Sequence, residues 1–129
     1  MRVRDRFIEA EDHLLVVTRG RWGRDAALRF VDSIASECRK SGQDRVLIDA
    51  TDVTGKMPDF DRYIIGTRIA AACEGIRIAA VIRAEYINKF AENVAVNRGA
   101  SFFVTSSRDE ALQWLMADSP DKTADDEGK

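Results

Sequence analysis

Four polar residues follow a short apolar run in the middle of the chain, and their types and spacing could support chemistry. The run 46–48 is aliphatic and β-branched, which is typical of a strand buried on both faces. The polar residues that come next are Asp49, Thr51, Asp52 and Thr54. Because ligands and partners of open α/β sheets meet the carboxyl ends of the strands, we expect this segment to lie at the working edge of a sheet.

A second apolar run, 77–82, is followed by Arg83 and Glu85, which should reach the same edge. Together these residues form a predicted binding surface, called here the strand-end surface. Its members are Asp49, Thr51, Asp52, Thr54, Arg83 and Glu85. Carboxylates in such a group could hold a metal ion or act as acid and base. We favour the alternative that the aspartates and threonines bond to backbone amides where strand gives way to helix.

No pattern in the chain predicts catalysis. His13 is the only histidine and has no second metal ligand near it in the sequence, so we interpret it as a strand-end residue. The chain has no glycine-rich phosphate loop, no HExxH motif and no nucleophile elbow. We therefore predict a protein that is not an enzyme, with no catalytic residue, no bound metal and no cofactor.

Three arginines flank Trp22 in a segment bounded by glycines: Arg19, Arg21 and Arg24. They could bind an anionic partner or stack on a base. A solvated loop whose tryptophan covers part of the core is the interpretation we favour. The net charge of −2 argues against a general nucleic-acid binder, because such proteins carry a basic excess.

Apolar segments of the chain are short. None is long enough for a signal peptide or a membrane span, so we expect a cytoplasmic protein. Cys38 and Cys73 show no CxxC spacing and no nearby histidine cluster. We interpret both as reduced core residues.

Periodic apolar residues and glycine or proline boundaries predict the secondary structure. In chain order we expect a hairpin over 7–18, a helix between Asp25 and Gly42, the strand 46–48, a helix between Pro58 and Gly75, the strand 77–82, a helix over 86–95, the strand 102–104, and a helix that follows a capping box at 107–110. Gly66 lies inside the second helix, which predicts close packing of this helix on a sheet or a partner.

This order predicts one small α/β domain over residues 1–117. Its mixed sheet should have about five strands, an antiparallel hairpin first and parallel strands after it, with four helices and right-handed crossovers. The segment 118–129 has five acidic residues, two lysines and no large apolar residue. We predict that this tail is disordered.

Two segments resemble the STAS family, the domain of bacterial anti-sigma-factor antagonists, and in particular uncharacterised bacterial STAS-like proteins. They are VLIDATDV at 46–53 and AEYINKFAENVAVNRGASFFVTSSRDEALQWL at 84–115, and the resemblance extends over most of 3–116. STAS antagonists carry a phosphorylated serine at the start of the helix after the central strand. The corresponding residues 56–60 include no hydroxyl, so no phosphorylation site is carried over. Thr54 is the nearest candidate, and a turn threonine bonding its own backbone is the alternative.

The resemblance implies a protein-interaction or regulatory module. We expect a protein partner or a second copy to bind the strand-end loops and the adjacent second helix. The alternative is a small-ligand or lipid-binding domain, because STAS-like proteins resemble lipid-transfer domains in structure. Its apolar pocket would be lined by Phe60, Tyr63, Ile64 and Phe90, which could equally be plain core residues.

Overall fold

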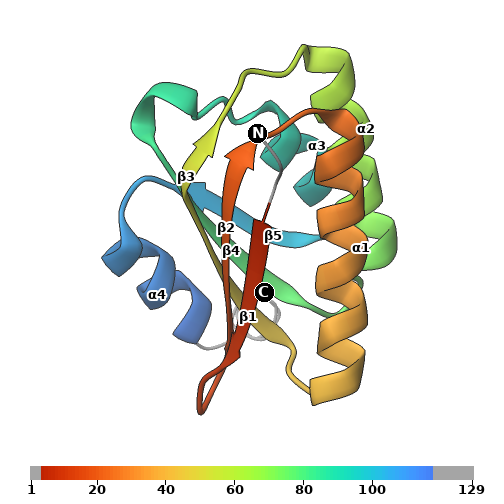
Figure 1. Cartoon of the computed structure of the whole chain (residues 1–129). Coiled ribbons are helices and arrows are strands. Elements are labelled where there is room, and N and C mark those ends of the chain that lie inside the picture. The colour runs from red at the N-terminus through yellow and green to blue at the C-terminus, as the bar shows by residue number, and fades with distance from the viewer. Residues whose placement is uncertain (1–3, 118–129) are drawn as a thin grey trace, which may run out of the picture.

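The computed structural model describes residues 4–117, so the predicted tail lies outside the described part (Figure 1). The elements are β1 (Arg4–Glu9), β2 (Leu14–Arg21), α1 (Arg24–Ser41), β3 (Arg45–Thr54), α2 (Asp59–Ala72), β4 (Arg77–Ile82), the 3₁₀ helix η1 (Ala84–Tyr86), α3 (Phe90–Asn97), β5 (Ser101–Thr105) and α4 (Arg108–Met116). Every strand and α-helix expected from the sequence is present.

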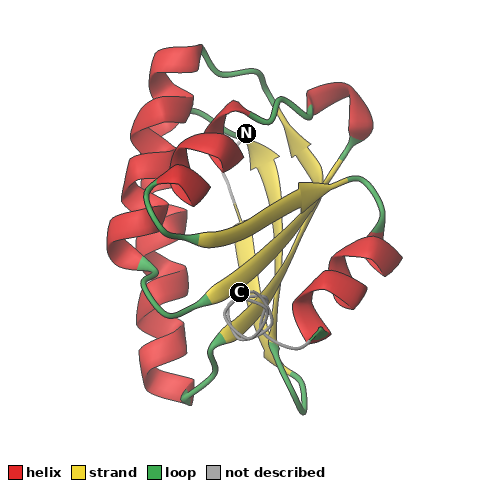
Figure 2. Cartoon of the chain, turned by 180° about the vertical axis from the view of Figure 1, so that it is seen from behind, coloured by secondary structure: helices red, strands yellow, loops and turns green. Residues whose placement is uncertain are grey.

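The strands form one sheet in the order β1-β2-β3-β4-β5. β1 pairs antiparallel with β2, and the remaining neighbours pair parallel, which confirms the predicted mixed sheet. The crossover helices α1, α2 and α3 lie on one face of the sheet, and α4 lies on the other (Figures 1 and 2). The sheet is therefore covered by three helices on one side and by a single short helix on the opposite side.

Alternation along the strands divides the apolar side chains between two cores. Ile48 and Ala80 face α1, α2 and α3, whereas their neighbours Leu47 and Ala79 belong to the smaller core under α4. Both faces of β3 and β4 are therefore buried, which explains their uninterrupted apolar runs.

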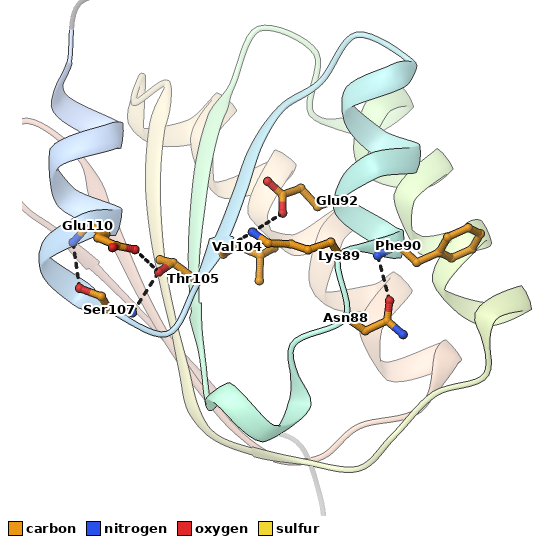
Figure 3. A network of polar contacts seen from close by, with 8 residues as sticks. All are labelled: Asn88, Lys89, Phe90, Glu92, Val104, Thr105, Ser107 and Glu110. Carbon is orange, nitrogen blue, oxygen red and sulfur yellow. Dashed lines mark hydrogen bonds and ion pairs between the residues drawn. The ribbon is translucent and has the colours of Figure 1, made fainter.

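Helix α4 begins at the predicted capping box. Ser107 Oγ accepts a hydrogen bond from the backbone N–H of Glu110 at 3.1 Å. The carboxylate of Glu110 does not accept the Ser107 N–H directly, as it would in a simple capping box. It accepts a hydrogen bond from Thr105 Oγ1 at 2.8 Å instead, and Thr105 Oγ1 accepts the Ser107 N–H (Figure 3). A buried threonine thus mediates the second half of the box.

Several boundaries differ from the sequence-based expectation, and the hairpin expected over 7–18 extends to Arg4 and Arg21. The helix expected over 86–95 is divided into η1 and α3, because Asn88 Oδ1 accepts a bond from the Phe90 N–H at 2.9 Å and starts a new helix there. The strand expected over 46–48 is observed as β3, which continues to Thr54. It continues because β2 also runs on through Gly20 and pairs with it beyond a register irregularity.

Gly66 lies where α2 meets α3. A Cβ atom at this position would come within 2.7 Å of the carbonyl oxygen of Ala91 and 2.9 Å of the Val94 Cβ. The close packing that this mid-helix glycine predicted is confirmed, but the neighbour is α3 and not the sheet or a partner, as was expected.

Candidate functional site

Four of the six residues of the strand-end surface lie on β3 itself, and not in a loop after it. Asp49 Oδ1 accepts bonds from the Thr51 N–H at 3.1 Å and from Thr51 Oγ1 at 2.7 Å. Its other oxygen lies 3.3 Å from Arg108 Nη1 at the start of α4. The carboxylate therefore satisfies a backbone amide and a neighbouring charge, but the amide belongs to β3 itself and not to the junction of strand and helix where it was expected.

The second half of β3 runs beside the arginines of β2. Asp52 lies opposite Arg19 in the register and Thr54 lies opposite Arg21. Asp52 is exposed, whereas Thr54 is half-buried. Arg19 and Asp52 thus place opposite charges on neighbouring strands, and Arg21 lies beside a threonine.

Arg83 and Glu85 follow β4 and bind each other. Arg83 Nη2 lies 3.2 Å from Glu85 Oε2, and the guanidinium carbon lies 5.5 Å from the centre of the Tyr86 ring. Both side chains are exposed. Glu85 and Asp49 are thus engaged by different arginines, and within residues 4–117 no three His, Cys, Asp or Glu side chains are grouped so that they could hold a metal ion.

His13 lies far from these residues in the fold, just before the amino end of β2. Its Nδ1 is 2.8 Å from Asp12 Oδ1. This hydrogen bond lowers the pKa of the Asp12 carboxyl below its ordinary value. The pair belongs to the β1–β2 turn and takes no part in the strand-end surface.

The four residues that were expected to line an apolar pocket lie at or near the protein surface and line no pocket. Phe60 is 65% exposed, Tyr63 42% and Phe90 37%, while Ile64 is half-buried. The reason is the orientation of α2, which turns Ile65 and Ile69 toward the sheet and leaves Phe60 and Tyr63 outside. The spacing of apolar residues in α2 fits two faces, and the sequence does not show which one is buried.

A pocket does exist at a different place. A cavity of about 170 Å³ lies between the sheet and the helices α1, α2 and α3. Side chains of β3, β4 and β5 line it on the sheet side, and almost all of its lining is apolar. The volume slightly exceeds that of engineered cavities of roughly 150 Å³ that bind benzene. Residues of the loops after β3 and β4 also line it, namely Gly55, Met57, Tyr86 and Asn88.

Trp22 forms one wall of the cavity. Its backbone N–H donates to the carbonyl oxygen of Thr54 at 3.0 Å, and its ring meets Phe30 edge-on with 4.8 Å between centroids. Gly55, which follows Thr54, has a φ of +107°, and a Cβ atom at Gly55 would lie 2.9 Å from the Trp22 carbonyl oxygen. This close approach favours glycine after β3.

The indole nitrogen of Trp22 has an unusual environment. Nε1 is buried and has no hydrogen-bond partner among the residues that the structure describes. A buried donor left without an acceptor costs about 1–3 kcal/mol. The sequence predicted a solvated loop whose tryptophan covers the core. Trp22 does pack against the core, but Arg19 and Arg21 lie in β2 and Arg24 begins α1, so the loop is wrong. The sequence did not indicate the cavity or the unpaired donor.

Lys89 joins the start of α3 to β5 beside the cavity. Its Nζ lies 2.8 Å from Glu92 Oε1 and also donates to the backbone carbonyl of Val104 (Figure 3). Glu92 and Val104 both line the cavity. Glu92 Oε1 is therefore ion-paired with Lys89 but, like Trp22 Nε1, is buried without a hydrogen bond among the described residues, so Trp22 presents the unpaired donor that carries no charge.

Both cysteines are buried and free. Burial raises the pKa of the Cys73 thiol to about 12, with a further contribution from nearby Cys38, whose own pKa is also raised by burial. Cys73 lines the cavity. Because a protonated thiol is a poor nucleophile and a poor metal ligand, its position in the cavity does not indicate covalent chemistry.

Comparison with known proteins identifies the fold. No protein-family model matches the sequence, and no curated protein matches it significantly. The crystal structure of an anti-sigma factor antagonist from Mycobacterium paratuberculosis is similar, with a TM-score of 0.62 and 11% identity over 90% of this chain and 96% of that chain. A protein of the DUF3478 family from Shewanella loihica, described as having a SpoIIAA-like fold, has a TM-score of 0.52 and 18% identity over 88% and 93% of the two chains.

These similarities confirm the predicted STAS-like fold. Within the described residues, no helix is both long enough and apolar enough to cross a membrane.

Proposed function

We propose that this protein is a non-enzymatic interaction module that binds a protein partner, or a second copy of itself, through the strand-end surface and the exposed face of α2. The fold supports this function in general terms, because one structural neighbour is named for its action against an anti-sigma factor. The partner of this chain need not be the same, since the sequences share only 11% identity.

The exposed aromatic face of α2 is the observation that carries the proposal. Phe60 is 65% exposed and Tyr63 is 42% exposed. They are three residues apart and therefore neighbours on the helix surface. Exposed aromatic side chains beside charged residues are typical of the centre of a protein interface. Since α2 begins five residues after the end of β3, this face is continuous in the chain with the strand-end surface.

The polar residues support binding and not catalysis. Asp49 and Glu85 are each paired with an arginine, and the two thiols are buried. The segment before α2 includes no hydroxyl side chain, so we propose that partner binding is not switched by phosphorylation at that helix start. We also propose a cytoplasmic location, where Cys38 and Cys73 remain reduced.

Site-specific photo-crosslinking in cells of the source organism tests the proposal. A benzoylphenylalanine in place of Phe60 should give an adduct of one defined mass. The matched control places the same group at Gln113, which is exposed on α4 on the other side of the sheet. The adduct from position 60 should disappear when Asp52, Thr54 and Arg83 are all changed to alanine. Equal labelling from both positions, or none from position 60, would refute the proposed surface.

The cavity favours a second function, the binding of a small apolar ligand. Its lining is almost wholly apolar, and the loops that follow β3 and β4 contribute to it. Ligands of α/β sheets bind at this edge of the strands. This function is compatible with the first, because Phe60 and Tyr63 do not line the cavity.

A further inference from the structure

The cavity and the unpaired indole N–H together indicate which ligand would fit. We propose that the cavity binds a small, uncharged, mostly apolar molecule that carries one hydrogen-bond acceptor, and that Trp22 Nε1–H donates to this acceptor. The inference rests on the ligand-binding function proposed above and adds the chemistry of the ligand. It is independent of the interaction surface on α2.

The volume limits the size of the ligand. A cavity of about 170 Å³ is far smaller than the roughly 300–1,000 Å³ of pockets for drug-sized molecules. It is close to the size that binds benzene when the walls are aliphatic and aromatic. The ligand should therefore be a single substituted ring or a short branched chain, and not a long-chain lipid.

The residues that line the cavity disfavour an anionic ligand. Lys89, at the start of α3, is already shared between Glu92 and the Val104 carbonyl, both of which line the cavity. Arg62 lines the cavity and donates from Nε to the carbonyl oxygen of Met57 at 3.0 Å, but Glu92 lines it too, so the lining has no excess of positive charge for a carboxylate. Moving a carboxylate from water into apolar surroundings without a charged partner is strongly unfavourable. A carbonyl or ether oxygen avoids this cost.

The unpaired indole N–H of Trp22 favours a ligand that carries a hydrogen-bond acceptor. Trp22 lines the cavity, its Nε1 is buried, and no acceptor among the described residues reaches it. Buried indole N–H groups normally have a partner. An oxygen of a bound molecule would provide one, so a ligand with an acceptor should bind more tightly than a hydrocarbon of the same shape.

Acetophenone and isopropylbenzene make a matched pair of probes. They have nearly the same shape, but only acetophenone carries an acceptor. Binding to the full chain would be followed in ¹⁵N-labelled protein, with the Trp22 indole signal assigned by its loss in Trp22→Phe. We expect both probes to shift backbone amides around the cavity, with acetophenone binding about fivefold to tenfold more tightly. Only acetophenone should move the Trp22 indole proton downfield.

Two variants separate the donor from the cavity. Trp22→Phe keeps an aromatic wall but removes the donor, so it should abolish the preference for acetophenone while isopropylbenzene still binds. Ala80→Ile fills the cavity from β4 and should weaken both probes at least tenfold. Its control is Ala71→Ile on the exposed side of α2, which should bind both as the wild type does.

The outcomes distinguish the two levels of the proposal. Equal binding of both probes, with no change at the Trp22 indole, would overturn the assignment of the donor and leave a simple apolar site. Benzoate binding more tightly than acetophenone would overturn the preference for an uncharged ligand. If neither probe binds the wild-type protein, both the acceptor assignment and the ligand-binding function fail, while the interaction surface stands or falls by its own test.

Discussion

The carbonyl oxygen of Ala91 lies so close to Gly66 that a Cβ atom at Gly66 would come within 2.7 Å of it. In an exposed helix, glycine-to-alanine changes stabilise by about 1 kcal/mol. Here the added methyl group meets backbone, so α2 and α3 must separate. We predict that Gly66→Ala lowers the free energy of unfolding by about 1–3 kcal/mol in urea denaturation.

Gly23 provides the control for this prediction. It is the N-cap of α1, and a Cβ atom there meets nothing within 4 Å. Gly23→Ser should leave stability unchanged or raise it by about 0.5 kcal/mol, because serine can bond to the first amides of the helix. If Gly66→Ala were as stable as Gly23→Ser, the close contact between α2 and α3 would be refuted.

The cap of α4 gives a second prediction. Ser107 Oγ accepts the N–H of Glu110, whereas the neighbouring Ser106 is exposed and outside the helix. Ser107→Ala should therefore cost about 1 kcal/mol of unfolding free energy, and Ser106→Ala much less. Thermal denaturation of the two variants in parallel measures this difference. Equal melting temperatures would contradict the capping role.

Lys89 should stabilise the start of α3. Lys89→Met keeps the aliphatic chain but removes the ammonium group that joins Glu92 to β5. We predict that Lys89→Met lowers the free energy of unfolding by about 1 kcal/mol. It should also speed up amide exchange, relative to the wild type, more in α3 than in α1. Lys56→Met, at an exposed lysine of the loop before α2, is the control. Identical exchange in both variants would exclude this role of Lys89.

Alkaline pH should destabilise the protein through Cys73. Burial raises the pKa of this thiol from 9.0 to about 12, so the unfolded chain loses a proton that the folded protein keeps. The contribution to stability is complete below pH 9 and is lost as the pH rises from 9 toward 12. Between pH 8 and 10 the stability advantage of the wild type over Cys73→Ala should fall by about 1.4 kcal/mol. If the free energies of unfolding of the two proteins changed with pH by the same amount, burial would not raise the pKa of Cys73.

Much of the fold could be predicted because the local signals agree with the packing. The expected stop of α1 at Gly42 is confirmed, since this glycine has a φ of 78° and its N–H bonds to the Cys38 carbonyl oxygen. The strand 77–82 is confirmed at the same bounds. Both predictions depend on local sequence. The end of α1 follows from the backbone freedom of glycine, and the strand follows from an unbroken apolar run.

The candidate sites depend on distances between elements, and these were predicted less well. The extension of β3 to Thr54 needs the pairing of Gly20 with Val53, which the polar sequence after Asp49 does not reveal. The cavity was expected beside Phe60 and lies instead behind Trp22, because volume is set by how far three helices stand from the sheet. Alternation along β3 and β4 could have identified its sheet side, but not the empty space.

The most direct test of the proposed function is the dissociation constant for the partner captured at position 60, measured by calorimetry. An exposed aromatic residue that becomes the centre of an interface contributes about 2 kcal/mol or more, so Phe60→Ala should weaken binding at least tenfold. The Asp52, Thr54 and Arg83 triple alanine variant should also bind more weakly, whereas Gln113→Ala should match the wild type. If all three folded variants bind with the same affinity as the wild type, the α2 and strand-end surface is not the interface.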